Sequence, residues 1–248
     1  MSTESLILDG LQLARGILLE VEKELDNKPN PDNLYVTYVG ALFLRTKDLY
    51  SGSIELINFK NTAASKVLLR TLTETYVSLY GCITDRSFAD QIMNTYWKQK
   101  KKQIDKFKDK QTELGFPFTN EQIEEIKSDI EKTMFPDTSS LRNAEENFRR
   151  FNMAPMYHQY YSYLSSYTHT DPYSLDEHVD KIENAYVLIP HKSLNIEALR
   201  CLQISMSLFT TAFHNYATFK KYDIRVASVL HEKSESWAKQ RLGQHKMK

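Results

Sequence analysis

The sequence predicts an all-α protein that folds as an irregular multi-helix bundle. Glycine and proline, which interrupt helices, occur only seven times each among 248 residues. Apolar residues recur at intervals of three and four through most of the chain, which is the helical period. The run "NAYVLIPHK" (184–192) is the only strand-like stretch and is too isolated to imply a sheet.

Three long helices are expected in the first third of the chain. The first runs from Thr3 to about Asp26 and ends where "NKPNPDN" supplies turn-forming prolines and asparagines. The second covers Leu34–Asn58, and we expect it to be loosened around Gly52. The third covers Thr62–Thr84.

The middle of the chain is rich in charge and is expected to form a protruding helical pair. The pattern predicts an amphipathic helix over Ser87–Glu113, a second helix opened by a capping box of Thr119 with Gln122, and a short helix over Ser139–Phe151. These elements suggest a helical insert over 86–150.

The last third begins with a tyrosine-rich helix that follows Pro155 and ends near Thr168. Long helices are predicted over Ser193–Lys221 and Asp223–Gln244. The tail 232–248 is basic and polar, and we expect it to fray. The whole chain, 1–248, is interpreted as one helical domain that carries the insert.

Composition favours a cytoplasmic protein without a membrane partner. Lys plus Arg equals Asp plus Glu at 32 each, so net charge gives no reason to expect nucleic acid or a membrane, and only local patches could steer a ligand. The most apolar run, 199–219, contains Gln, Ser, Thr, His and Asn and suits a buried helix better than a bilayer span. Cys82 and Cys201 lie in apolar helical patterns and are expected to be buried thiols.

Several kinds of chemistry have no sequence signal. No Glu-x-x-His, His-x-x-x-His or Cys-x-x-Cys spacing occurs, so no metal site is predicted. There is no phosphate-binding glycine loop and no G-x-S-x-G motif, which argues against ATP-driven chemistry and acyl hydrolysis. We therefore expect no cofactor.

The tyrosine-rich helix is polar yet has no formal charge from Phe151 to Thr170. His158, Ser162, Ser165 and His169 are spaced i, i+4, i+7 and i+11, so an ideal helix places them on one stripe. An uncharged polar stripe bordered by aromatic rings suits a partly desolvated interior surface. The candidate binding residues of this helix are His158, Tyr161, Ser162 and Ser165.

A candidate partner for that stripe lies on the third helix. Arg70 and Glu74 are spaced i, i+4 in an otherwise apolar run, so they can pair. A buried pair of this kind costs several kcal/mol in desolvation unless further hydrogen bonds complete it. We therefore expect the Arg70–Glu74 face to meet the stripe from His158 to His169.

Two interpretations of this meeting remain open. In the structural one, the pair fixes helix register through Tyr and Ser hydroxyls and has no chemistry. In the functional one, His169 is a general acid or base, Arg70 binds a phosphate or carboxylate bidentately, and Glu74 orients either residue.

A basic stretch, Lys98–Lys110, is a second candidate for phosphate contact. Lys100, Lys101 and Lys102 could touch a nucleic-acid backbone in a salt-sensitive way. Nearby aspartates dilute the charge, so a solvated helix face is the alternative.

Two motifs carry a resemblance to a known family. "LLRTLTET" (Leu68–Thr75) and "YSYLSSYTH" (Tyr161–His169) resemble the R-x-x-x-E-T and Y-x-x-L-S-x-x-x-H motifs of an uncharacterised bacterial family, a domain of unknown function. The resemblance covers roughly Leu34–Phe219. It implies an all-helical fold and offers no established activity.

The chain is also similar, at the level of fold, to the HEPN superfamily of helical ribonucleases and toxins. That signature places Arg and His about five residues apart on one helix, whereas the residue five before His169 is Leu164. Arg70 would have to supply the cation from a neighbouring helix. The analogy implies an RNA-directed nuclease or toxin, with phage defence as a setting. The alternative is a non-catalytic helical interaction module that forms a homo-oligomer through its aromatic surface.

Overall fold

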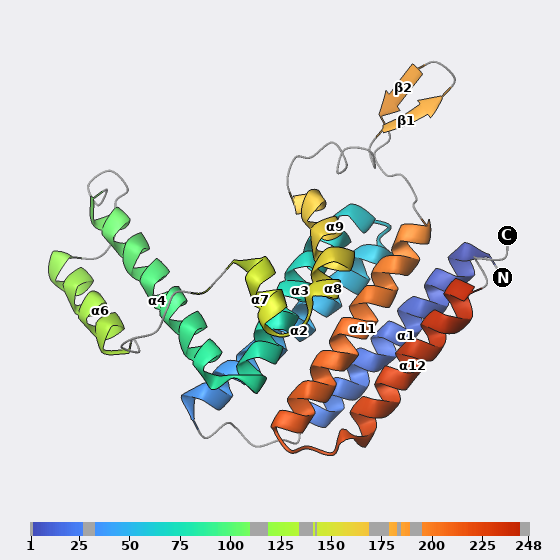
Figure 1. Ribbon diagram of the computed structural model, residues 1–248. Coiled ribbons are helices and arrows are strands. Elements are labelled where there is room, and N and C mark those ends of the chain that lie inside the picture. The colour runs from blue at the N-terminus through green and yellow to red at the C-terminus, as the bar shows by residue number, and fades with distance from the viewer. Residues whose placement is uncertain are drawn as a thin grey trace. The chain divides into compact units, whose positions relative to one another are not determined.

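The computed structural model describes residues 2–26, 33–109, 119–133, 141, 143–168, 179–182, 185–188 and 195–243 (Figure 1). The chain divides into two compact units, one formed by Met1–Ile83 with Ala144–Lys248 and the other by Thr84–Asn143. The helical insert expected over 86–150 remains a prediction about domain organisation, and each unit is described by itself below.

The all-α class is confirmed. The first unit contains the helices α1 (Thr3–Asp26), α2 (Leu34–Asn58), α3 (Thr62–Thr84), α7 (Ala144–Arg150), α11 (Asn195–Phe219) and α12 (Ile224–Gly243), with a helical segment over Ala154–Thr168. No helix in the described part of the chain is long and apolar enough to cross a membrane.

One short β-hairpin accompanies the helices. The strands β1 (Val179–Ile182) and β2 (Ala185–Leu188) pair antiparallel, with Val179 opposite Leu188. The expectation that the strand-like run 184–192 forms no sheet was therefore wrong. The upstream strand has no β signal of its own in the sequence, and its pairing with β2 is what makes it extended.

The centre of the first unit is helix α11, which contacts α1, α2 and α12 (Figure 1). Aromatic rings fill the boundary between α11 and α2: Phe43 stacks on Tyr216 with 4.4 Å between ring centroids, and Tyr50 stacks on Phe209 at 4.2 Å. Tyr50 is fully buried, and its hydroxyl donates a hydrogen bond of 2.9 Å to the carbonyl oxygen of Ala14 on α1. The stacked rings and the hydrogen bond of the buried Tyr50 hydroxyl together hold α1, α2 and α11 in contact.

Helix α12 corrects the expectation of a frayed tail. The helix continues to Gly243, and Leu230, Ser234 and Trp237 are buried along one face. This i, i+4, i+7 spacing was hidden in the sequence by the many charged residues between them. Fraying is therefore wrong for residues 232–243, and residues 244–248 lie outside the described part.

Gly52 does not loosen α2, contrary to expectation. The helix is continuous from Leu34 to Asn58, and a Cβ atom at Gly52 would lie 3.0 Å from Leu68 Cδ1 of α3. The hydroxyl oxygens of Ser53 and Ser65 lie 2.9 Å apart at the same contact. The missing side chain at Gly52 therefore allows α2 and α3 to approach closely and does not interrupt α2.

The second unit is a pair of helices, α4 (Arg86–Asp109) and α6 (Asn120–Thr133), which pack on each other. The predicted capping box at the start of α6 is confirmed: the backbone N–H of Thr119 donates to Gln122 Oε1 at 2.8 Å, and the N–H of Gln122 donates to Thr119 Oγ1 at 3.3 Å. An ion pair between Lys101 and Glu131 joins the two helices.

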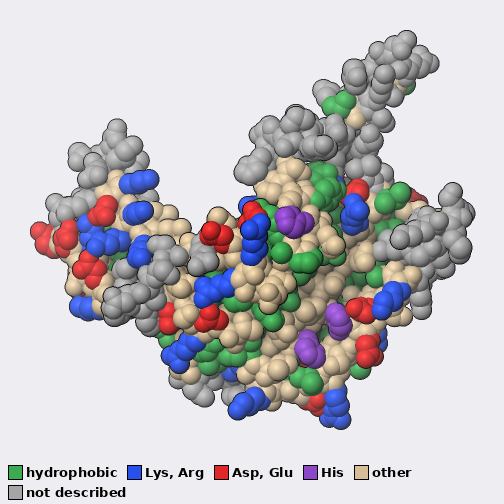
Figure 2. All heavy atoms as spheres, viewed as in Figure 1, with side chains coloured by type: hydrophobic (Ala, Val, Ile, Leu, Met, Phe, Trp, Pro, Cys, Tyr) green, Lys and Arg blue, Asp and Glu red, His purple; other side chains and the backbone are tan. Residues whose placement is uncertain are grey.

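Charges of both signs are interspersed over the face of the bundle shown in Figure 2. This pattern agrees with the equal numbers of acidic and basic residues in the sequence. A ligand reaching this face would respond to individual charged groups rather than to a broad field of one sign.

Gly10 on α1 allows α12 to approach closely, which gives a direct test of the packing. A Cβ atom at Gly10 would lie 2.6 Å from Trp237 Cζ2, whereas a Cβ at Gly16 would meet nothing within 4 Å. We expect Gly10→Ala to lower the free energy of unfolding by about 1–3 kcal/mol through overpacking. Gly16→Ala, the matched control on the same helix, should raise it by about 0.5–1 kcal/mol. Urea denaturation measures both, and equal effects of the two variants would contradict the packing.

Candidate functional site

Helix α3 and the tyrosine-rich segment meet through one phenol. Arg70 Nη2 donates to the Tyr161 hydroxyl oxygen at 2.8 Å, and the same hydroxyl donates to Glu74 Oε1 at 2.7 Å. Arg70 Nη2 also lies 3.3 Å from Glu74 Oε1, so the ion pair predicted from the i, i+4 spacing is present. These three residues are called the Arg70–Tyr161–Glu74 network.

The network is only partly enclosed. Tyr161 is 7% exposed, whereas the side chains of Arg70 and Glu74 are 24% and 36% exposed. Arg70 Nε is buried and has no hydrogen-bond partner within the described residues. A guanidinium has five N–H donors, so this one retains donor capacity beyond Tyr161 and Glu74.

Burial raises the pKa of Tyr161, and its hydrogen bond to Glu74 raises the pKa further, while Arg70 acts in the opposite direction. The phenol therefore stays neutral at physiological pH and keeps its proton for the carboxylate. A neutral hydroxyl that accepts from a cation and donates to an anion completes the pair without adding charge.

The segment that supplies Tyr161 is not a regular α-helix. It consists of α8 (Ala154–Met156), a π-helical turn η1 (Tyr157–Tyr161), α9 (Ser162–Ser165) and a 3₁₀ turn η2 (Ser166–Thr168). A π-helical turn contains more residues than an α-turn, and such turns occur frequently at functional sites. Side chains after the turn therefore face a direction that a 3.6-residue period does not predict.

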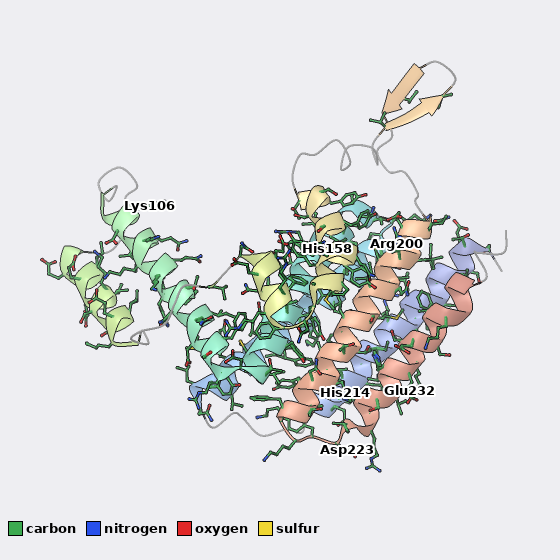
Figure 3. The ribbon with its side chains drawn as sticks, viewed as in Figure 1. Lys106, His158, Arg200, His214, Asp223 and Glu232 are labelled. Carbon is green, nitrogen blue, oxygen red and sulfur yellow. The ribbon has the colours of Figure 1, made fainter. Side chains whose placement is uncertain are left out.

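Two residues of the expected polar stripe, His158 and Ser162, are exposed rather than enclosed against α3, and for them the prediction was wrong. His158 and Ser162 are exposed, Ser165 is half-buried, and the Ser162 hydroxyl donates to the carbonyl oxygen of Tyr157 at 3.2 Å. The π-helical turn instead presents the stacked rings of Tyr157 and Tyr161, whose centroids are 5.2 Å apart. Figure 3 labels His158 on this segment.

Packing against Phe148 of α7 explains why the turn presents Tyr157 and Tyr161 rather than the polar stripe. The ring centroid of Phe148 lies 5.5 Å from that of Tyr157 and 5.4 Å from that of Tyr161, and Phe148 is 1% exposed. Burying three rings outweighs burying two small hydroxyls and an imidazole. His169, the predicted acid or base, lies outside the described residues, which stop at Thr168 before this position.

A second charged cluster was missed by the sequence reasoning. Lys66 lies one turn before Arg70 on α3, and its side chain is 1% exposed. Its Nζ atom lies 3.2 Å from Glu197 Oε2 of α11 and 4.0 Å from the ring centroid of Tyr167. The Tyr163 hydroxyl donates to the same carboxylate oxygen at 2.5 Å. We call these four residues the Lys66–Glu197 cluster.

One signal in the sequence could have indicated this cluster. Lys66, Arg70 and Glu74 are spaced i, i+4, i+8, so they share one face of α3. Glu197 gave no such signal, because it sits at the start of a helix, where acidic residues are common.

The electrostatics of the Lys66–Glu197 cluster favour an ionised carboxylate. Burial alone would raise the pKa of Glu197, but the Tyr163 hydrogen bond and the charge of Lys66 outweigh burial and lower it. Burial and the bond to Glu197 raise the pKa of Tyr163, so this phenol also stays neutral. Tyr161 and Tyr163 thus each donate a hydrogen bond to a carboxylate, the first to Glu74 and the second to Glu197.

The lysines proposed as a phosphate contact all lie on α4 in the second unit. Lys101 is paired with Glu131, Lys102 is exposed, and Lys100 Nζ lies 5.1 Å from the ring centroid of Trp97. These contacts are typical of a solvated helix face, and their role in binding stays a prediction.

Metal and disulfide chemistry find no support in the described residues. No group of three or more His, Cys, Asp or Glu side chains there could hold a metal ion. Cys82 and Cys201 are buried and form no disulfide in that part of the chain.

The fold and the network define a helical protein with a partly enclosed Arg–Tyr–Glu site between two helical segments. The chain belongs to the family of unknown function DUF5677, whose model matches residues 36–186. The match contains Lys66, Arg70, Glu74 and Tyr161 and ends before Glu197. The resemblance inferred from the two motifs is confirmed, whereas the HEPN analogy stays a prediction. No curated protein and no solved structure matches the chain.

Removing the Tyr161 hydroxyl tests whether the network holds α3 to the tyrosine-rich segment. We expect Tyr161→Phe to lower the free energy of unfolding by about 1–2 kcal/mol, because Arg70 and Glu74 each lose a partner. Tyr157→Phe, on the same turn, should change stability by less than about 0.5 kcal/mol. Chemical denaturation compares the two, and indistinguishable values would contradict the role of the phenol.

The lowered pKa of Glu197 predicts a pH dependence of stability. A carboxylate whose folded pKa lies below its ordinary value of 4.5 stabilises the fold above pH 4.5 and loses that contribution as pH falls through the folded pKa. Glu197→Gln should cost about 3 kcal/mol near neutral pH, and its deficit relative to the natural chain should shrink below pH 4.5. Denaturant melts across this range measure the deficit.

Glu232→Gln, at an exposed position on α12 (Figure 3), is the control with the same change of charge. It should leave stability nearly unchanged at every pH, because exposed substitutions away from packed groups have small effects. A deficit of Glu197→Gln that stays constant below pH 4.5 would contradict the electrostatic account.

Proposed function

We propose that the chain is an RNA-directed nuclease or toxin, with phage defence as its setting, in which Arg70 binds the phosphate. The observation that carries the proposal is the state of Arg70: its guanidinium is partly exposed and is oriented by Tyr161 and Glu74. A guanidinium held in this way matches the bidentate geometry of a phosphate.

The chemistry would be in-line cleavage of RNA. His169 would take the proton of a ribose 2′-hydroxyl as its oxygen bonds to phosphorus. The bond from phosphorus to the 5′-oxygen breaks, and the leaving oxygen takes a proton from water. Arg70 would stabilise the charge that develops on the phosphoryl oxygens, and Glu74 would orient Arg70.

This arrangement differs from the HEPN signature in one respect that matters. There the cation and the imidazole share a helix, whereas here Arg70 lies on α3 and His169 follows the tyrosine-rich segment. The hydrogen bond between Arg70 and Tyr161 ties these two elements together and supports the proposal that they act jointly.

A non-catalytic interaction module is the second candidate. It is supported by a pocket of about 290 Å³ whose lining includes Leu8, Ile57 and Ala198. Leu8 is 65% exposed, and Phe59, which follows the lining residue Asn58, is 75% exposed. Exposed apolar side chains around a pocket are typical of interaction surfaces, including those of homo-oligomers.

Substitutions of the proposed phosphate-binding and proton-transferring residues separate the two candidates. We expect His169→Ala and Arg70→Lys to reduce cleavage of single-stranded RNA by about 100-fold or more. Growth toxicity on expression should fall with cleavage, while the melting temperature of His169→Ala stays close to that of the natural chain. His214→Ala, a change to a half-buried histidine on α11 (Figure 3), should preserve cleavage.

The opposite pattern would favour the interaction module. A natural chain that cleaves no RNA, together with a fall of several degrees in melting temperature for the Arg70 and His169 variants, would reject the nuclease. Size-exclusion chromatography with light scattering would then show whether the chain self-associates.

A further inference from the structure

A second pocket lies between the tyrosine-rich segment and α11. Its volume is about 360 Å³, and it is lined by Gln159, Tyr160, Tyr163, Arg200 and Ile204. This volume is in the range of small-molecule sites. Tyr161, on the same turn, reaches α3 instead, so the pocket and the Arg70–Tyr161–Glu74 network use different faces of one segment.

Contacts outside the pocket hold the ring of Tyr163, which forms its aromatic wall. The Tyr163 hydroxyl donates to Glu197 at 2.5 Å, and Glu197 is paired with the enclosed Lys66. The Tyr167 ring packs against the edge of Tyr163, with 5.4 Å between centroids. A ring anchored at its hydroxyl and at its edge needs little reorganisation to receive a planar ligand.

Among the described residues at the pocket, Lys66, Glu197 and Arg200 together leave one positive charge in excess. Glu197 is ionised, and Lys66 neutralises it from the buried side at 3.2 Å. Arg200 Nη1 lies 3.5 Å from Glu197 Oε1, and its side chain is 58% exposed, so this pair is loose. The guanidinium carbon of Arg200 lies over the Tyr163 ring, 5.6 Å from its centroid. Because this side chain is 58% exposed, an entering base can displace it from the ring while its charge stays at the pocket.

We propose that this pocket binds one unpaired nucleotide, with the base against Tyr163 and the phosphate on Arg200. Tyrosine rings stack bases of any identity, and arginine binds phosphate bidentately. Gln159 carries both a donor and an acceptor for the edge of the base, and Ile204 supplies an apolar floor. Figure 3 labels Arg200 on the N-terminal part of α11.

The choice of RNA as the source of the nucleotide rests on the proposed function. The same chemistry would hold a free nucleotide, because a base next to a phosphate is common to both. Only an unpaired base can enter, since a paired base has its face and edge occupied in the duplex. The pocket would therefore select single-stranded positions of an RNA.

Calorimetric titration of the full chain tests the pocket. The probes are adenosine and uridine 5′-monophosphate, adenosine without phosphate, ribose 5-phosphate without base, and a short RNA as single strand and as duplex. We expect the monophosphates to bind, and each half-ligand to bind about tenfold more weakly or worse. Tighter binding of the single strand than of the monophosphates, with no gain for the duplex, identifies RNA as the source. Equal or weaker binding of the strand identifies a free nucleotide, and both results support the pocket.

Two exposed positions supply the variants. Arg200→Ala should weaken monophosphate binding about tenfold, and Gln159→Ala should weaken it less. Arg225→Ala on α12, whose side chain is 88% exposed and paired with Asp223, should leave it unchanged. Failure of every probe to bind the natural chain would overturn the proposal, as would binding that Arg200→Ala leaves intact.

These outcomes are distinct from those of the cleavage assay. If RNA cleavage depends on Arg70 and His169 but nucleotide binding is unchanged in Arg200→Ala, the proposed nucleotide pocket is rejected and the nuclease is not. Binding that depends on Arg200 in a chain that cleaves no RNA would reject the nuclease alone and leave the pocket as a nucleotide site.

Discussion

The rest of the site depends on hydrogen bonds from neutral tyrosine hydroxyls to the ion pairs that involve α3. Lys66, Arg70 and Glu74 occupy one face of a helix that is otherwise packed into the bundle. Charges removed from water need partners of good geometry, or the fold loses several kcal/mol. Tyr161 and Tyr163 provide them, each donating to a carboxylate that is paired with a cation. The position of the tyrosine-rich segment against α3 follows from these bonds.

The same interaction explains why the segment 151–170 is polar but without charge. A further permanent charge here would upset pairs that already balance, whereas a phenol can donate to a carboxylate and stay neutral. Burial raises the pKa of both Tyr161 and Tyr163, which keeps the donating proton in place. The rings also bury apolar area, so one residue type provides packing and hydrogen bonding together.

Helix boundaries could be predicted where local signals were strong, and contacts across space could not. Apolar periodicity with clear breakers defined α1, α2 and α3 at the residues observed. The π-helical turn at Tyr157–Tyr161 could not be foreseen, because it depends on how two rings pack on Phe148. The prediction that Arg70 and Glu74 meet the tyrosine-rich helix was right about the helices and wrong about the face. A 3.6-residue period cannot represent a wider turn.

The burial of the charged face of α3 changes along its length. The Lys66 side chain is 1% exposed, Arg70 is 24% and Glu74 is 36% exposed, over two turns of one helix. A group enclosed as fully as Lys66 cannot meet a ligand without opening the bundle, so its contribution is to hold Glu197 and Tyr163. Arg70 and Glu74 lie where solvent and a ligand can reach them, and the buried end of the face fixes their geometry. The enclosed end of this face is therefore structural, and the phosphate contact proposed for Arg70 would use only the exposed end.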